Sequence, residues 1–453
     1  MNNCAPIVQN AQAPRDPRRG NRKHLPENGF RIPLPRSPVQ PVRMTDAGIP
    51  AAHIVLLLCA RPLPDASVDA ALGEAISRGV EWDALLALAE ANRMLPLAHR
   101  ALAGRADVPE TVRSRLRIVF TGNGRQALAL AAELRRLVAA LQGAGVRSLA
   151  YKGPALAMRA YGHLALRTYS DLDLLVAPDD VPAAARVLAA AGYQSAHRFT
   201  PAQEAAFRRT DGDYPYHHPR TAVLVELHCH VSSLRFGVPL ATQRLIARAR
   251  PVPIGGGGVL APADDDLFLA LCLHGAKHRW ARLEWLAAAA ALAVRARLDL
   301  DALLVRAAEV GARRTVLLAL RLMRDALALP LSPAADRAAS ADRVLPALAA
   351  EARALWFAAD PHPPVDAGDS TDSATPALTH SRTHALNETA ANLRFNYRLR
   401  EGAADRARFA ARWLFTPSPE DWAWARLPDA LSPLYRALRP LRLGVRYGLR
   451  RGG

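Results

Sequence analysis

Residues 146–228 alternate between short apolar runs and helical spacing, and this alternation limits the folds open to the chain. Apolar runs of strand length occupy residues 146–151, 172–176 and 222–228, with helical spacing between them. A succession of strand, helix, strand, helix and strand is typical of a small α/β unit. The flanking regions are rich in Ala, Leu and Arg, which favour helices. We therefore predict an α+β protein whose small sheet is embedded in mostly helical regions.

Composition divides the chain further. Residues 1–45 are rich in Pro, Arg and Asn, and residues 360–391 are rich in Pro and polar residues, so we expect a disordered tail and a disordered linker. The glycine run at 255–258 predicts a short flexible connector. The predicted segments are a tail (1–45), a helical region (46–143), the sheet-containing core (144–250), a second helical region (251–359), a linker (360–391) and a basic helical segment (392–453).

The formal net charge of +18 is concentrated near the two ends of the chain. Residues 1–43 and 394–453 together contribute 14 of these 18 charges, so the centre is close to neutral. Nucleic-acid binding usually needs a basic stripe, and we do not expect nucleic acid as a partner. For the basic C-terminal segment, a solvated helix is the simplest interpretation, with a membrane surface or a partner as alternatives.

The four cysteines form no Cys-x-x-Cys pair, which argues against a zinc site and is typical of free thiols in a reducing compartment. No stretch reaches the roughly 18 consecutive apolar residues of a membrane span. The basic N-terminal stretch is followed by prolines instead of an apolar block, unlike a signal peptide. We therefore expect a cytoplasmic protein without a transmembrane segment.

Two carboxylates alternate at the start of the second predicted strand. Asp171 and Asp173 project from one face, whereas Leu172 and Leu174 project from the other, into the core. Neighbouring carboxylates repel each other unless a cation lies between them, and Mg²⁺ takes oxygen ligands together with substrate phosphates. Glu226 on the third strand reaches the same cations if that strand pairs beside the second. These three carboxylates are the predicted metal-binding and catalytic residues.

A strand-to-helix turn at Lys152 and Gly153 supplies the other requirement of such chemistry. Glycine lets the backbone approach a triphosphate, and the following helix N-terminus favours anions. Lys152 or Arg167 adds positive charge there. With two metal ions, one activates an attacking hydroxyl and the other stabilises the leaving pyrophosphate. We therefore expect two Mg²⁺ ions and a nucleoside triphosphate as substrate.

Histidines near these motifs leave two interpretations open. His228 and His230 alternate with Glu226 in the third strand and would share its face, as metal ligands or, more simply, as polar residues lining a cleft. His274 and His278 are four residues apart on a predicted helix, and we expect a polar helix face near the site.

The motifs together resemble a bacterial family described as uncharacterised nucleotidyltransferases. The resemblance rests on Lys-Gly-Pro-Ala-Leu-Ala at 152–157, Arg167, Ser-Asp-Leu-Asp-Leu-Leu-Val at 170–176, and Glu-Leu-His-Cys-His at 226–230. Helical motifs near Trp82, His274, Asp421 and Arg439 resemble other parts of the family. The resemblance to this family covers most of residues 50–445, apart from the predicted linker.

The resemblance implies a small α/β palm of the DNA polymerase beta type, with Asp171, Asp173 and Glu226 binding metal. It also implies nucleotide contacts from Lys152, Gly153, Arg167 and Ser170. Similar proteins occur beside genes for polysaccharides and peptide natural products. The expected activity is metal-dependent transfer of a nucleoside monophosphate from a nucleoside triphosphate to an unidentified small-molecule, sugar or protein acceptor.

The chain departs from the resembled pattern in three ways, and the first two departures support an alternative. Pro154 stands where the wider superfamily has Ser or Gly, and it offers neither an N–H nor a hydroxyl to a phosphate. Ala287 or Ala288 stands where relatives tend to carry an Asp. The interval from Gly153 to Asp171 is also longer than usual. The alternative is a catalytically impaired protein of the same fold that serves as an accessory or binding module in a biosynthetic complex.

Overall fold

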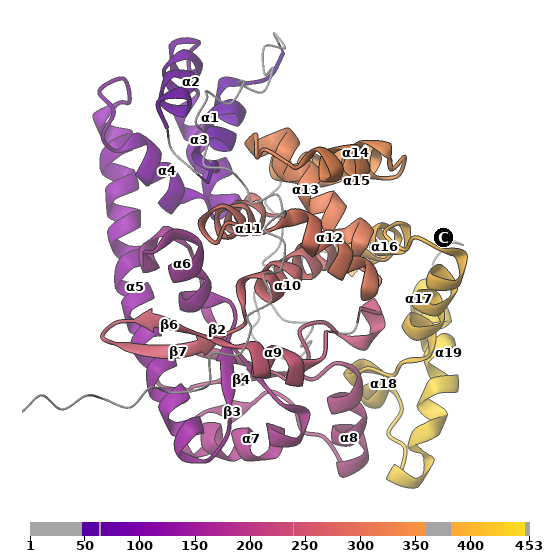
Figure 1. Ribbon diagram of the computed structural model, residues 1–453. Coiled ribbons are helices and arrows are strands. Elements are labelled where there is room, and N and C mark those ends of the chain that lie inside the picture. Colours follow the sequence, from indigo (N-terminus) through magenta and orange to yellow (C-terminus); the bar gives the residue numbers. More distant parts are fainter. Residues whose placement is uncertain (1–47, 63–64, 239, 359–381, 449–453) are drawn as a thin grey trace, which may run out of the picture.

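The computed structural model describes residues 48–448, apart from 63–64, 239 and 359–381 (Figure 1). The predicted tail at 1–45 and most of the predicted linker lie outside the described residues. The last part of that predicted linker belongs to a helix, which begins at Arg382.

A five-stranded mixed sheet has the strand order β1-β2-β5-β4-β3. Its strands are β1 (Ser148–Ala150), β2 (Asp171–Val176), β3 (Gln194–Ser195), β4 (Asp213–His217) and β5 (Leu224–His228). Only β2 and β5 are parallel, and every other neighbouring pair is antiparallel. In the register of β2 with β5, Asp173 lies beside Glu226. The condition on which the predicted role of Glu226 depends, that its strand pairs beside the Asp171 strand, is thus met.

The two faces of β2 and β5 differ in chemistry. Leu172 and Leu174 of β2 are fully buried, together with Val225 and Leu227 of β5, in a core that includes residues of the helices α5 and α7. Side chains alternate along a strand, so the aspartates of β2 project from the opposite face. That face carries the candidate site.

Helices surround the sheet (Figure 1). Those that precede or interrupt it are α1 (Ala51–Cys59), α2 (Ala66–Ser77), α3 (Trp82–Ala91), α4 (Leu95–Leu102), α5 (Glu110–Gly143), α6 (Gly153–Tyr161), α7 (Val181–Ala190) and α8 (Pro201–Thr210), and α9 (Thr242–Arg248) follows it. Short 3-10 turns are η1 (Leu164–Leu166), η2 (Pro178–Asp180) and η3 (Leu234–Phe236). The 34-residue α5 packs against α4, α7 and the first two strands.

The glycine run at 255–258, predicted as a flexible connector, contributes to a β-hairpin instead. Strands β6 (Arg250–Ile254) and β7 (Gly257–Ala261) pair antiparallel, and Gly255 and Gly256 both have positive φ in the turn. Glycine is favoured in such a turn because it adopts positive φ without a steric penalty. The hairpin packs on β1 and α6.

The second helical region shares its core with the first. It comprises α10 (Asp264–Lys277), α11 (Leu283–Arg295), α12 (Leu300–Glu309), α13 (Arg313–Leu327), α14 (Pro333–Ala341) and α15 (Leu345–Trp356). One hydrophobic cluster joins residues of α1 to α4 with residues of α10 to α15. The alanine-rich α11 is almost entirely buried and packs against α6, so it approaches the site face of the sheet.

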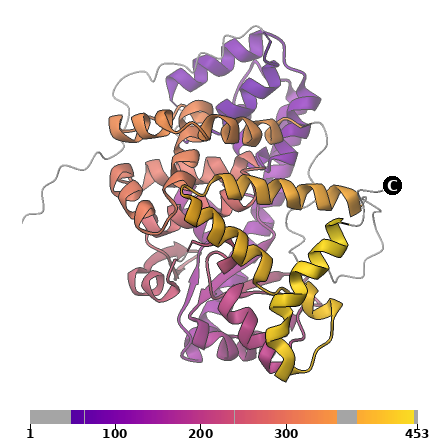
Figure 2. The ribbon, with the colours of Figure 1, turned by 90° about the vertical axis from the view of Figure 1, so that its right-hand side faces the viewer.

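The C-terminal helices dock beside the sheet, as Figure 2 shows. They are α16 (Arg382–Arg398), α17 (Ala403–Phe415), α18 (Pro419–Trp424) and α19 (Tyr435–Gly448), with a 3-10 turn η4 (Asp429–Leu434). Trp422 packs edge-on against Phe199 at 5.1 Å, and η4 packs on α8. Among the described residues, no helix combines the length and the apolar composition that crossing a bilayer requires.

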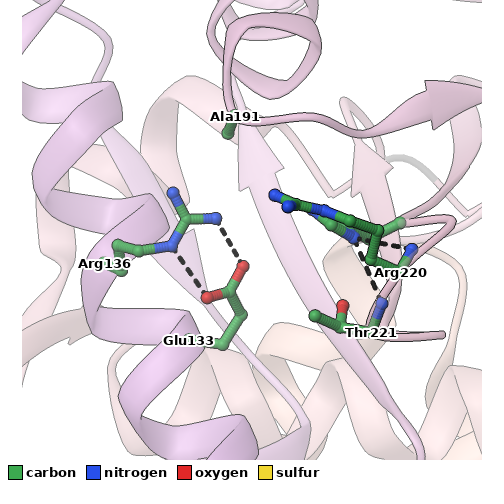
Figure 3. A pocket seen from close by; sticks show the side chains of 6 residues that line it. Glu133, Arg136, Ala191, Arg220 and Thr221 are labelled. Atoms are coloured by element: carbon green, nitrogen blue, oxygen red, sulfur yellow. Dashed lines mark hydrogen bonds and ion pairs between the residues drawn. The ribbon is translucent and has the colours of Figure 1, made fainter.

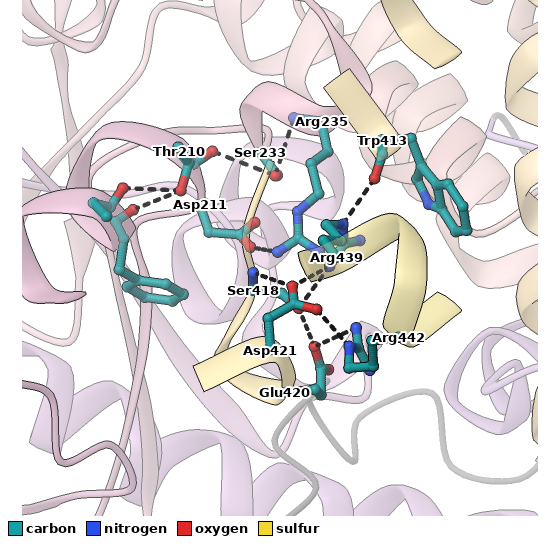
Figure 4. A network of polar contacts seen from close by, with 12 residues as sticks. Thr210, Asp211, Ser233, Arg235, Trp413, Ser418, Glu420, Asp421, Arg439 and Arg442 are labelled. Carbon is teal, nitrogen blue, oxygen red and sulfur yellow. Dashed lines mark hydrogen bonds and ion pairs between the residues drawn. The ribbon is translucent and has the colours of Figure 1, made fainter. Parts of the chain in front are cut away.

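A buried polar network holds this C-terminal segment together (Figure 4). The Asp421 carboxylate accepts hydrogen bonds from Arg439 Nη1 at 2.6 Å and from Arg442 Nε. Arg439 also donates to Ser418 Oγ at 2.8 Å and to the Trp413 carbonyl at 2.9 Å. Two arginines of the basic helix α19 therefore point inward and are neutralised, and they do not form part of an exposed basic surface.

Candidate metal and nucleotide site

Five ionisable side chains meet on the site face of three adjacent strands. Asp171 and Asp173 come from β2, Glu226 and His228 from β5, and Asp213 from β4. The strand pairing explains the meeting, because register places Asp173 opposite Glu226 and Asp213 opposite His228.

Asp173 is at the centre of this group. Its side chain is almost fully buried, and its Oδ1 lies 2.8 Å from Lys152 Nζ and 3.2 Å from His228 Nε2. Its other oxygen, Oδ2, is buried without a hydrogen-bond partner among the residues that the structure describes. A buried carboxylate oxygen without a partner is costly, so this atom is poised to accept a ligand.

Asp173, Glu226 and His228 have the geometry of a cation site. One potential ligand atom from each lies within 4.8 Å of the other two, and the partnerless Asp173 oxygen adds a free acceptor. Two carboxylates and an imidazole are a common donor set for divalent ions. These residues therefore fit a divalent cation. Asp171 is not a member of this group of three, although it is close enough to Asp173 and Glu226 to interact with their charges.

The charges of the site leave an excess of negative charge. Burial, helped by the neighbouring carboxylates of Asp173 and Glu226, raises the pKa of Asp171 to about 6. Burial also raises the pKa of Asp213. Carboxylates shift in this direction when low dielectric and like charges disfavour the ionised form. A divalent cation would relieve both effects.

Positive charges offset part of this excess at Asp173 and Glu226. Burial alone would raise the pKa of Asp173, but Lys152 and His228 hold it below its ordinary value. Burial alone would raise the pKa of Glu226, but the hydrogen bond from His228 and the charges of Lys152 and His228 together lower it. His228 in turn has its pKa raised to about 10, because surrounding carboxylates outweigh burial. The site thus holds a proton on His228 and an ammonium at Lys152 when no metal is bound.

The turn before α6 brings Lys152 to the carboxylates. Gly153 has a φ of +51°, and a Cβ placed on it would lie 3.4 Å from the Asp171 carbonyl oxygen. This conformation and close approach favour glycine. Pro154 occupies the first turn of α6, where the missing N–H costs no intrahelical hydrogen bond. The turn therefore fixes Lys152 but offers no amide from Pro154.

Arg167 is held by a helix far away in the sequence. Its Nε donates to Glu284 Oε1 of α11 at 2.6 Å, and both side chains are buried. Asn123 of α5 donates to the carbonyls of Ala165 and Arg167 at 2.7 Å and 3.1 Å, which fixes the backbone of the same segment. Ser170, by contrast, is exposed just before β2.

Two further arginines lie on the same side of the site. Asn92 Oδ1 accepts the N–H of Leu283 at 3.0 Å, and this bond brings Arg93 and Arg282 together from distant parts of the chain. Burial lowers the pKa of both, and the charge of Arg93 helps to lower that of Arg282 to about 10. Both also interact with the charge of Asp171. The carboxylates thus have arginines nearby that suit a polyanionic ligand.

The other histidines differ in their relation to the site. The rings of His274 and His278 pack together and against Trp285. Burial and nearby cations, including Lys152, lower both pKa values well below the ordinary value. They are therefore neutral residues close to the site. His230 is bound elsewhere, since its Nε2 lies 2.8 Å from the Arg208 carbonyl.

Sequence reasoning missed Asp213, Glu284, Arg93 and Arg282. Asp213 begins β4, in which Pro215 interrupts any strand-like pattern. Glu284 is 117 residues away from Arg167, and no local pattern signals that pair. The sequence offered one hint, the run Leu-Glu-Trp-Leu at 283–286, which contains Glu284 and directly follows Arg282.

A separate pocket of about 450 Å³ contains none of these residues (Figure 3). It is lined by Glu133, Arg136, Ala191, His218, Arg220 and Thr221. Arg136 is neutralised by Glu133 at 2.6 Å, and His218 Nδ1 accepts the backbone N–H groups of Arg220 and Thr221. Glu133, Arg136 and His218 of this pocket are thus committed to local structure, and we assign the pocket no chemistry.

One face of the small mixed sheet carries the buried Asp173, three half-buried carboxylates and an imidazole, with cations nearby. These features define a protein able to bind a divalent cation beside an anionic ligand. Comparison with family models narrows this class. The model of a family described as uncharacterised nucleotidyltransferases matches residues 78–328. The chain belongs to this family and is a nucleotidyltransferase, an enzyme that transfers phosphorus-containing groups. A search of curated proteins and a search of solved structures gave no match.

Proposed function

We propose that the protein transfers a nucleoside monophosphate from a nucleoside triphosphate to an acceptor, with divalent cations at Asp171, Asp173 and Glu226. The observation that carries this proposal is the buried Asp173 oxygen without a partner beside Glu226. We infer that the sheet is a palm of the DNA polymerase beta type. Two Mg²⁺ ions would activate the attacking hydroxyl and stabilise the leaving pyrophosphate.

The triphosphate would lie between the carboxylates and the cations around them. We assign nucleotide contacts to Lys152, Gly153, Arg167 and Ser170. The proximity of Lys152 to Asp173 supports the first assignment. Arg167 is buried against Glu284, so its role would be to contribute positive charge from a fixed position.

The acceptor remains a small molecule, a sugar or a protein hydroxyl or phosphate. The resemblance of the motifs to proteins encoded beside polysaccharide and peptide natural-product genes supports a role in such biosynthesis. The C-terminal helices are the best surface for a membrane or protein partner. Of the 14 exposed large apolar side chains in the described residues, seven lie between 414 and 445. Sedimentation with anionic vesicles would distinguish these two partners.

The alternative is an accessory protein that keeps the fold without turnover. Two features favour it: Pro154 at the turn, and alanines at positions 287 and 288, where relatives tend to carry an Asp. Both alanines are buried in α11 against other apolar residues. The alternative predicts a folded protein that binds its complex but neither binds nor turns over a nucleotide.

Calorimetry of nucleotide binding tests the proposal. The wild-type protein and the double variant Asp171→Asn plus Asp173→Asn are titrated with ATP, GTP, CTP and UTP, with and without Mg²⁺. A control variant, Asp179→Asn plus Asp180→Asn, makes the same charge change outside the site. Metal-dependent binding that the site variant loses and the control keeps would support the enzyme. No binding by the folded wild type would favour the accessory protein.

A further inference from the structure

The His228 imidazole lies between the two carboxylates of the cation site. Its Nε2 is 3.2 Å from Asp173 Oδ1 and 3.3 Å from Glu226 Oε2. The side chain is buried, and the Tyr151 ring packs edge-on against it with 5.4 Å between centroids. The ring is therefore held with one nitrogen directed at the atoms that would bind a metal.

The other nitrogen of the ring faces a carboxylate outside this group. His228 Nδ1 lies 3.5 Å from Asp213 Oδ1, across the paired strands β4 and β5. Histidines that bind metals usually donate their second ring N–H to a carboxylate or carbonyl, which fixes the tautomer and the ring orientation. The Asp213–His228 pair has this arrangement, with Nε2 left for the metal.

An ion pair alone does not account for this arrangement. Asp173 Oδ1 already accepts from Lys152 at 2.8 Å, and Oδ2 stays buried without a partner in the described part of the chain. A cation shared by Asp173, Glu226 and His228 would satisfy that oxygen, and it would use the Nε2 that the ring already directs at both carboxylates.

We propose that His228 is a direct metal ligand through Nε2, so that this site prefers a transition ion such as Mn²⁺ to Mg²⁺. Imidazole suits first-row transition ions, whereas Mg²⁺ takes oxygen ligands almost exclusively. The inference deepens the proposed function, on which it rests, because it concerns the identity of one of the metal ions.

Electron paramagnetic resonance tests this directly with Mn²⁺ as the probe. Free Mn²⁺ is titrated with the full-length protein to obtain a Kd, and electron spin echo modulation of the bound ion reports nitrogen ligands. We expect ¹⁴N modulation in the wild type and its loss in His228→Asn, with Mn²⁺ affinity reduced at least tenfold. In competition, Mg²⁺ affinity should change much less. His230→Asn, two residues along the chain, is the matched control and should keep the modulation.

The outcomes separate the inference from the proposed function. Bound Mn²⁺ without nitrogen modulation in the wild type, or equal affinity for Mn²⁺ and Mg²⁺, overturns the inference but leaves a carboxylate-bound metal intact. If the folded wild type binds neither ion, with or without a nucleoside triphosphate, the proposed function fails as well. The wild-type spectrum decides whether a nitrogen ligates, even if His228→Asn does not fold. Asp213→Asn then supplies a milder variant, expected to keep the modulation and weaken Mn²⁺ binding.

Discussion

Lys152 occupies the position beside Asp173 that a metal ion would share. Its ammonium lies 2.8 Å from Asp173 Oδ1; burial lowers the pKa of Lys152, but attraction to Asp173, helped by the other negative groups of the site, raises it well above the ordinary value. Lys152 therefore stays charged and has two opposing effects. It stabilises the carboxylate when metal is absent, and it competes with metal for the same oxygen.

This competition predicts opposite effects of one substitution. Lys152→Met should tighten metal binding in the absence of nucleotide, by about tenfold if roughly 1.4 kcal/mol of repulsion is removed. The same change should weaken binding of the metal–triphosphate complex, because a positive charge near the phosphates is lost. Calorimetry with Mn²⁺ alone and then with nucleotide measures both. If both affinities fall, Lys152 stabilises the site and does not compete with metal.

His274 and His278 predict a loss of stability in mild acid. Their folded-state pKa values are far below 6.5, so the unfolded chain takes up protons that the folded protein excludes. The contribution of these neutral rings to the free energy of unfolding is at its full value above pH 6.5, and it decreases as the pH falls below 6.5. At pH 5.5 the loss is about 1.4 kcal/mol for each ring.

Urea unfolding of the wild type and of His278→Gln between pH 8 and pH 5.5 isolates this contribution, because comparing the two cancels the opposite effect of His228, whose pKa is raised. His278→Gln should lose less stability in acid than the wild type, by about half of the two-histidine contribution, and His217→Gln, at an exposed position, is the control. An unchanged slope in His278→Gln would show that other groups cause any loss in acid.

At the scale of elements, the turn between α10 and α11 is shaped by one close packing contact. A Cβ on Gly275 would lie 2.5 Å from the Trp280 ring, and Arg279 and Trp280 both have a φ of +55°. Trp280 is fully buried, and its carbonyl accepts from Trp356 Nε1 at 2.6 Å. The indole thus fixes the direction in which α11 leaves, and with it the position of Glu284.

Gly275→Ala should therefore destabilise the protein by about 1–3 kcal/mol, since overpacking forces a rigid ring and its backbone to move. Gly311→Ala makes a poor control, because Gly311 has positive φ, whereas Gly143→Ala at the end of α5 has open space and no such φ. Thermal unfolding compares the two. If nucleotide binding weakens in Gly275→Ala while Gly143→Ala is unaffected, the contact also positions Glu284 and Arg167.

Elements with local patterns could be predicted from the sequence, and elements defined by partners could not. The alternation of Asp and Leu in β2 predicted its two faces, and β5 was apparent from its apolar run. Strand β4 contains Pro215 and few apolar residues, so its own sequence does not indicate a strand. Its strand conformation depends on pairing with β5 and β3. Hairpin β6–β7 was hidden by prolines and glycines for the same reason. Asp213 was missed as a consequence.

At the scale of the whole molecule, long-range contacts join segments that composition had separated. The two helical regions share one core, and Arg167–Glu284 links the sheet to α11. The C-terminal helix α19 was expected to be a solvated basic helix, yet Arg439 and Arg442 are buried on Asp421 while Leu441 and Val445 are exposed. The sequence predicts a helical segment here, but the position of Asp421 determines which face of α19 turns inward.

This arrangement predicts that Asp421 stabilises the whole C-terminal segment. Asp421→Asn leaves two buried arginines with reduced compensation and should cost about 3 kcal/mol of the free energy of unfolding. Asp405→Asn in α17 breaks a solvent-exposed pair with Arg408 and should cost less than about 1 kcal/mol. Urea unfolding measures both.

Because Trp422 packs against the sheet side of the molecule, Asp421→Asn should also speed proteolysis within 400–448 at native pH, whereas Asp405→Asn should not. Equal, small effects of the two variants would mean that apolar packing around Trp422 and Tyr435 docks the segment without help from the ion pairs.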